Sequence, residues 1–97
     1  RSSDLKAVAL APQEPALADT LGVALLRAGE QQEAVSVLTS ARQAAPQSGS
    51  IGFHLAQALS AMGDAEGAVA VLEEVLRSDS RFGERGEAEA LLAALTR

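Results

Sequence analysis

A spacing of 34 residues recurs along this chain of 97 residues and constrains its fold more than any other feature. Leu21 returns as Leu55, for example, a separation of 55 − 21 = 34 positions. A fixed period of this length indicates stacked copies of one supersecondary unit. The other pairs that keep this spacing are Leu25 and Leu59, Gly29 and Gly63, Ala34 and Ala68, Leu38 and Leu72, and Pro12 and Pro46.

The residue types within each unit predict an all-α fold. The chain is 47% hydrophobic but only 2% aromatic, so its apolar content is mostly Ala, Leu and Val. Ala and Leu have high helix propensities, and their small or medium side chains allow helices to approach closely. The apolar spacing predicts two helices in the first complete unit, over residues 15–28 and 31–45, and two in the second, over 50–62 and 65–78.

Local signals mark where these helices begin, end and cross. Pro15 suits a first helical turn because its missing N–H has no intrahelical partner there. Gly29 and Gly63 can adopt the left-handed conformation that ends a helix, and Asp64 is expected to cap the helix after it. Gly22 removes side-chain bulk, which predicts that another helix crosses the chain at that point.

Apolar side chains at three- or four-residue spacing predict which faces of the helices pack together. In the second helix of the first unit, we expect Ala34, Val35, Leu38 and Ala41 to point inward. In the next unit, we expect Leu55, Ala56 and Leu59 to face Ala68, Leu72 and Val75.

Both ends of the chain are expected to be helical as well. Residues 1–12 correspond, in the 34-residue register, to the second helix of a unit whose first helix is absent, and an N-terminal cap is the alternative. Residues 84–96 are expected to form a closing helix with a polar outer side, which repeat arrays need for solubility. Its apolar stripe is Ala88, Leu91, Leu92 and Leu95.

The 34-residue unit resembles the tetratricopeptide repeat (TPR). The resemblance rests on Leu21-Gly22, Leu25, Gly29, Ala34, Leu38, Ala41 and Pro46. The chain departs from the family where Ala18 and Gly52 stand in place of a frequent Trp, and where Leu25 and Leu59 stand in place of a frequent Tyr. The resemblance implies an α-α superhelix (a TPR solenoid) of antiparallel helix hairpins, forming a single TPR domain over residues 1–97. Its parts would be a partial repeat at 1–12, TPR units at 15–48 and 49–82, and a C-terminal capping helix at 84–96.

The segment Phe82-Gly83-Glu84-Arg85, with EAEALLAAL after it, is similar to the end of one bacterial group within the TPR family. This group comprises TPR lipoproteins linked to exopolysaccharide production and to protein sorting of the PEP-CTERM type. Asp19-Thr20-Leu21-Gly22 and Phe53-His54-Leu55-Ala56 resemble the same group. The resemblance implies a part of a larger bacterial TPR protein in the cell envelope or periplasm, whereas the residues themselves do not indicate a compartment.

The charge and composition of the chain restrict its partners. Its formal net charge is −5, whereas binding to nucleic acids or anionic membrane surfaces requires a basic face. The absence of cysteine excludes disulfides and thiolate metal sites. No apolar run approaches the roughly 20 residues that a membrane-spanning helix needs. We therefore expect a protein or peptide partner, with no nucleic acid and no direct membrane insertion of this segment.

The first helices of stacked hairpins line the concave side of such an array, so we expect their outward faces to form a groove. A polar groove with a few apolar spots suits an extended peptide or a partner helix. The alternative is a face that contacts only solvent. The predicted groove residues are Asp19, Thr20, Val23, Arg27, Phe53, His54, Gln57, Glu84 and Glu87.

Other kinds of site are disfavoured by the sequence. His54 is the only histidine, and no motif gives it a nucleophile or a second metal ligand, so we expect no enzyme activity, no metal and no cofactor. Phe53 and Phe82 are more consistent with packing anchors than with ligand platforms. The groove lacks the Lys, Asn and Arg pattern with which some TPR proteins bind a C-terminal carboxylate. The expected function is a non-catalytic protein–protein interaction scaffold.

Self-association through the ends of the array is the alternative function. Leu5, Val8 and Leu10 would form an apolar edge on the N-terminal helix where a neighbouring unit is missing. Such an edge could join two copies of the chain into a homo-oligomer.

Overall fold

Helices account for the regular structure of the part of the chain that the structure describes. This computed structural model describes residues 15–78 and 82–96, and no strand occurs among them. The five helices predicted within this range each begin and end within one residue of their expected bounds. The helix expected over residues 1–12, with its proposed self-association edge, lies outside the described residues. In chain order the helices are α2 (Pro15–Arg27), α3 (Gln31–Ala44), α4 (Gly49–Ala61), α5 (Ala65–Ser78) and α6 (Arg85–Leu95).

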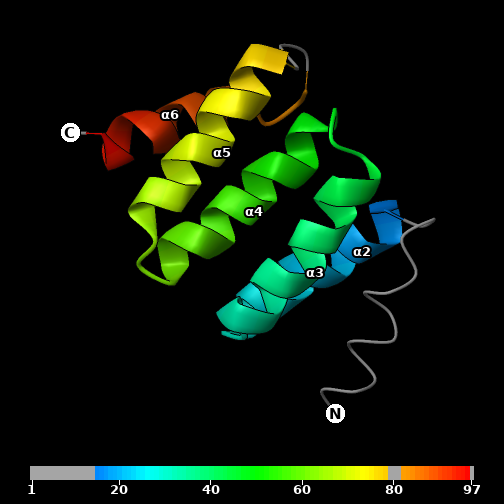
Figure 1. Cartoon of the computed structure of the whole chain (residues 1–97). Coiled ribbons are helices and arrows are strands. Elements are labelled where there is room, and N and C mark those ends of the chain that lie inside the picture. The colour runs from blue at the N-terminus through cyan, green and yellow to red at the C-terminus, as the bar shows by residue number, and fades with distance from the viewer. Residues whose placement is uncertain (1–14, 79–81, 97) are drawn as a thin grey trace.

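Consecutive helices pack against one another as hairpins (Figure 1). α2 and α3 form one hairpin, α4 and α5 form the next, and α3 lies against α4, so the hairpins stack in chain order. α6 packs against α5 and therefore covers the end of the second hairpin. α4 also contacts both α2 and α6, so it is a direct neighbour of each of these two helices. This arrangement confirms the predicted all-α array of antiparallel hairpins.

The turns within the two hairpins have the same geometry. Gly29 and Gly63 have φ angles of 85° and 89°, a left-handed conformation that residues with a side chain rarely adopt. The residue after each glycine donates its backbone N–H to a carbonyl five positions earlier, which satisfies an acceptor at the helix end. These bonds join Glu30 to Leu25 at 2.8 Å and Asp64 to Leu59 at 2.9 Å.

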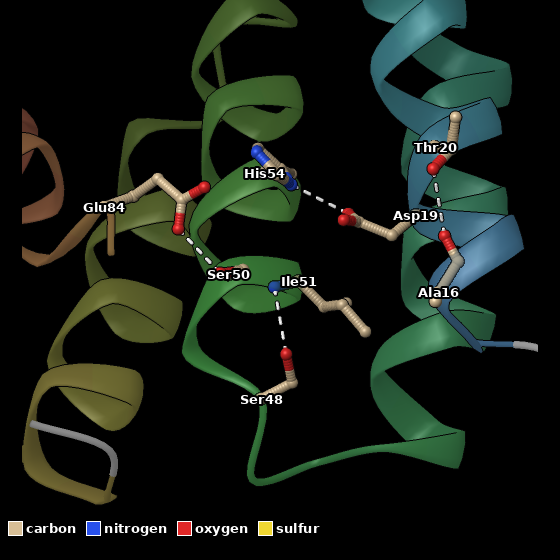
Figure 2. Close-up of polar contacts among 8 residues, drawn as sticks. All are labelled: Ala16, Asp19, Thr20, Ser48, Ser50, Ile51, His54 and Glu84. Carbon is tan, nitrogen blue, oxygen red and sulfur yellow. Dashed lines mark hydrogen bonds and ion pairs between the residues drawn. The ribbon is translucent and has the colours of Figure 1, made fainter. Parts of the chain in front are cut away.

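Side chains cap two of the helix starts. Asp64 Oδ1 accepts a hydrogen bond from the backbone N–H of Gly67 at 3.0 Å, as the sequence predicted. Ser48, which was not identified from the sequence, accepts the N–H of Ile51 at 3.5 Å at the start of α4 (Figure 2). Both caps use a short polar side chain to satisfy a donor that the helix leaves unpaired.

The first hydrophobic core lies between α2, α3 and α4. Gly22 sits where α2 crosses α3, because a Cβ atom at this position would overlap the side chain of Leu38, which is fully buried. The Leu38 side chain of α3 therefore lies directly against the backbone of α2 at Gly22, as expected for the predicted crossing. The buried residues of this core are Ala18, Leu25, Ala34, Val37, Leu38, Ala41, Ile51, Leu55 and Ala58.

The structure corrects part of the predicted packing. Val37, which was not predicted to point inward, is buried, whereas Val35 is only partly buried. Leu55 was expected to face α5 but packs in the first core with residues of α2 and α3. Leu59 is partly buried and packs against both cores. The reason is that α4 packs against the first hairpin as well as against α5 and α6, so it buries two of its faces, whereas a single apolar stripe was predicted for it.

The second core lies between α4, α5 and α6. Phe53 is 4% exposed and packs here, consistent with a packing anchor. Phe82 packs against the same core and lies over Gly49, where a Cβ atom would overlap its ring. The predicted stripe of α6 faces this core, with Ala88 fully buried. The buried residues are Phe53, Ala56, Ala68, Leu72 and Ala88, with Leu91, Leu92 and Leu95 partly buried against them.

Candidate functional site

An open hollow of about 420 Å³ lies across α2, α4 and α6. It is lined by the C-terminal half of α2, the middle of α4, and residues at the start of α6, so it crosses the three helices obliquely. Seven of the nine groove residues predicted from the sequence line it, and Leu26 was missed. The lining residues are Val23, Leu26, Arg27, Phe53, His54, Gln57, Glu84 and Glu87.

The 34-residue period explains why residues far apart in the sequence meet in this hollow. Val23 and Gln57 differ by 57 − 23 = 34 positions, and Phe53 and Glu87 by 87 − 53 = 34. Equivalent positions of stacked units lie on the same side of the array. The units therefore contribute two pairs of equivalent positions to the hollow, with different side chains at each, while the remaining lining residues differ from helix to helix because the hollow runs obliquely.

Leu26 lines the hollow but was not among the predicted groove residues. Val23, Leu26 and Arg27 have the i, i+3, i+4 spacing that places side chains on one face of a helix. The two outer members of this set were predicted to line the groove, so the spacing itself could have identified Leu26. Its side chain is partly buried against the first core and adds apolar surface to the hollow.

A hydrogen-bonded pair joins two neighbouring units beside the hollow. His54 Nδ1 lies 2.7 Å from Asp19 Oδ1, and the side chains are only 16% and 19% exposed (Figure 2). His54 comes from α4 and Asp19 from α2, so the bond connects the first helices of consecutive hairpins. Asp19 was predicted to face a ligand, but the structure turns its carboxylate toward His54.

The surroundings of His54 favour its protonated form. The hydrogen bond to Asp19 is the main cause that raises the pKa of His54 above its ordinary value of 6.5, although burial acts in the opposite direction. The charge of Asp19 raises the pKa further, and so do the charges of Glu84 and Glu87 on the other side of the hollow. His54 therefore lies in a region of negative potential.

A second hydrogen bond joins α4 to the start of α6. Ser50 Oγ donates to Glu84 Oε1 at 2.6 Å (Figure 2). These residues also occupy equivalent positions in consecutive units, since 84 − 50 = 34. Together with the Asp19–His54 pair, this bond ties three successive inner helices to one another.

Three predicted groove residues contribute differently from the others. Thr20 is exposed, and its hydroxyl donates to the carbonyl of Ala16 in the same helix at 3.1 Å (Figure 2). Neither Thr20 nor Asp19 lines the hollow. Phe53 lines the hollow but is almost fully covered, and its ring centroid lies 5.6 Å from that of His54. Phe53 therefore acts as the floor of the hollow rather than as a projecting contact.

The described residues offer little for other kinds of site. They contain no group of three or more His, Asp or Glu side chains that could hold a metal ion. None of their helices combines the length and apolar character needed to cross a bilayer. A second hollow of about 350 Å³ lies on α5 beside Leu95 and is lined by Ala65, Glu66, Val69, Ala70, Glu73 and Leu95.

Comparison with known proteins supports the repeat interpretation. A family model described as tetratricopeptide repeat matches residues 25–95, which is 71 of the 97 residues (95 − 25 + 1 = 71). The match therefore extends over most of the chain. Neither the curated proteins nor the solved structures contain a significant match to it.

Proposed function

This chain belongs to the tetratricopeptide repeat family, and on that basis we propose that it binds an extended peptide or a partner helix in the groove formed by α2, α4 and α6. The family supports a role as a protein-interaction scaffold in general terms. The observation that supports binding in this groove is the hollow itself, because three successive inner helices line it together.

The chemistry of the hollow fits a protein ligand. Val23, Leu26 and Phe53 give it an apolar floor, on which a partner side chain could bury its surface. Gln57, an exposed amide on α4, offers both a donor and an acceptor to a peptide backbone. Helix-in-groove and extended-peptide recognition both rely on this combination of an apolar floor and a polar rim.

The geometry of the Asp19–His54 pair favours binding over catalysis. A hydrolytic dyad of this kind needs a nucleophile that donates to the second ring nitrogen of the histidine. Ser50 lies one turn before His54 on α4, but its hydroxyl donates to Glu84 instead. The pair therefore serves in this proposal as a connection between helices.

The proposal also covers the cellular system in which the protein acts. Residues 82–85 and the segment that follows resemble bacterial TPR lipoproteins of exopolysaccharide and PEP-CTERM sorting systems. We place this segment in a larger bacterial TPR protein of such an envelope system. Fractionation of bacteria that express the full-length protein should recover it with the envelope, and recovery with the cytosolic fraction would contradict this placement.

Selection from a library of random twelve-residue peptides tests the groove. Peptides that bind the chain are measured by fluorescence anisotropy against the wild type and two variants. Gln57→Trp should fill the hollow and weaken binding at least tenfold, because it occupies the space of the ligand. Ala70→Trp places the same side chain at an exposed position of α5 and should leave affinity unchanged.

Two outcomes count against groove binding. If the library yields no binding peptide, the chain does not recognise peptides. If Gln57→Trp and Ala70→Trp have equal effects on the selected peptides, the binding surface lies elsewhere. Circular dichroism of both variants checks that the helices are retained.

A further inference from the structure

The charges around the hollow are unevenly distributed. Glu84 and Glu87 lie on its α6 side, whereas Arg27 lies on its α2 side. Arg27 and Glu87 are exposed, and neither makes an ion pair with another described residue. Both charges are therefore open to a ligand.

Negative charge dominates the centre of the groove as well. Asp19 and His54 are bonded to each other, so their charges offset one another when the imidazole is protonated. The Ser50 hydroxyl that donates to Glu84 is a neutral group, so this hydrogen bond does not offset the charge of the carboxylate. The pKa of His54 is raised mainly by its hydrogen bond to Asp19, and the charges of Glu84 and Glu87 raise it further, so these two carboxylates act on the middle of the groove as well as on its rim. A cationic group would be attracted there, and a carboxylate repelled.

We propose that the segment bound in this groove carries a lysine or arginine side chain against Glu84 and Glu87. The same segment places an apolar side chain over Val23 and Phe53. At its other end it presents an acidic group to Arg27. This inference rests on the proposed function, since it specifies the ligand of the same groove.

The spacing of the helices sets the spacing of these groups. Packed helices have axes about 8–10 Å apart, so α2 and α6, on either side of α4, are separated by roughly 16–20 Å. An extended peptide rises about 3.3 Å per residue and covers this distance in about five or six residues. A bound helix rises about 1.5 Å per residue and needs about 11–13 residues. The basic and acidic groups of the ligand should therefore lie about five or six residues apart in an extended peptide, or about 11–13 residues apart in a helix.

The peptide selection provides the first test. Among peptides whose binding is lost in Gln57→Trp, we expect an excess of Lys and Arg over Asp and Glu at one end and an apolar residue near the middle. The affinity of such a peptide should fall as the salt concentration rises from 50 to 500 mM, because salt screens exposed charges.

A matched pair of double variants provides the second test. The variant E84Q/E87Q removes two charges from the groove but retains a side-chain oxygen that can accept from Ser50. The variant E66Q/E73Q removes the same number of charges beside the second hollow on α5. The first should weaken binding of a selected basic peptide about 3- to 10-fold, and the second by less than about twofold.

The direction of the ligand is tested with Arg27→Gln. This change should lower the affinity for peptides that carry the acidic group opposite Arg27 about 2- to 5-fold, and it should leave the affinity for peptides without that group unchanged. An equal loss for both kinds of peptide would refute the assigned orientation.

The possible outcomes separate this inference from the proposed function. If groove-dependent peptides are selected but are neutral or acidic, or if E84Q/E87Q leaves their affinity unchanged, the inference is wrong while groove binding stands. If no groove-dependent peptide is selected, both fail. If E84Q/E87Q loses its helical circular dichroism, two measurements with the wild type test the inference instead. They are the excess of Lys and Arg in the selected peptides and the fall of their affinity with rising salt.

Discussion

Replacing Gly22 by alanine tests a close contact between α2 and α3. In most helix interiors a Gly→Ala change stabilises a protein by about 0.5–1 kcal/mol. At Gly22 the added Cβ atom would overlap the side chain of Leu38, which has no exposed surface and cannot move into solvent. We therefore expect Gly22→Ala to destabilise the fold instead.

The magnitude follows from two opposing contributions. Inserting a methyl group into a well-packed core costs about 1–3 kcal/mol, and the gain in helix propensity offsets up to about 1 kcal/mol of it. With the full offset of about 1 kcal/mol, the net destabilisation should be about 0–2 kcal/mol, centred on about 1 kcal/mol. For a domain of this size such a change lowers the thermal midpoint by several degrees, at about 4–8 °C per kcal/mol.

Gly86 supplies a matched control within the same chain. It lies in α6, and a Cβ atom added there meets no other atom within 4 Å. Gly86→Ala should therefore be neutral or slightly stabilising. Urea denaturation followed by circular dichroism at 222 nm gives the free energy of unfolding of the wild type and both variants.

The reasoning fails if Gly22→Ala proves as stable as Gly86→Ala. A double-mutant cycle with Leu38→Ala identifies the cause of any loss. Leu38→Ala alone should cost about 2–5 kcal/mol through the cavity that it leaves. Adding Gly22→Ala to that variant should cost less than it does in the wild type, because the overlapping atoms are gone. Strictly additive effects would show that the two residues do not touch.

Two further predictions concern single polar contacts. Because the folded-state pKa of His54 is raised, its bond with Asp19 should contribute its full stability below pH 6.5 and lose it as the pH rises through the folded-state pKa. The free energy of unfolding, measured from pH 5 to 9, should therefore fall as the pH rises through this window. Asp19→Asn should make the dependence on pH weaker. If the variant shows the same dependence on pH as the wild type, a group other than His54 is responsible for it. Asp64→Ala should destabilise the fold by about 1 kcal/mol, because α5 loses its cap. Asp64→Ser should retain most of the stability that the cap contributes. Equal losses for the two variants in urea denaturation would contradict the capping role.

The boundaries of the helices were predictable because local residues set them. Gly29 and Gly63 adopt the left-handed conformation, and Asp64 caps its own helix, so each signal acts within a few positions of the chain. The position of the hollow was predictable for a related reason. The repeat period places equivalent positions on one side of the stack, and the groove residues were chosen from those positions.

The contacts within the groove were less predictable. The Asp19–His54 bond joins residues 35 positions apart and depends on how closely α2 approaches α4. Phe53 occupies a groove position in the register, yet α6 and α5 cover it almost completely. A helical face shows which side chains lie together on one helix but not how a neighbouring helix lies over them.

The helical array and its 34-residue unit could be predicted from the residues alone, because period, propensity and turn residues act along the backbone. The burial of Val37 rather than Val35, and the packing of Leu55 toward the first hairpin, depend on how the helices are arranged in space. The physical reason is that a helix within a stack has neighbours on two sides. The angle and spacing of those neighbours, which no single stretch of sequence specifies, decide which of its side chains lose contact with water.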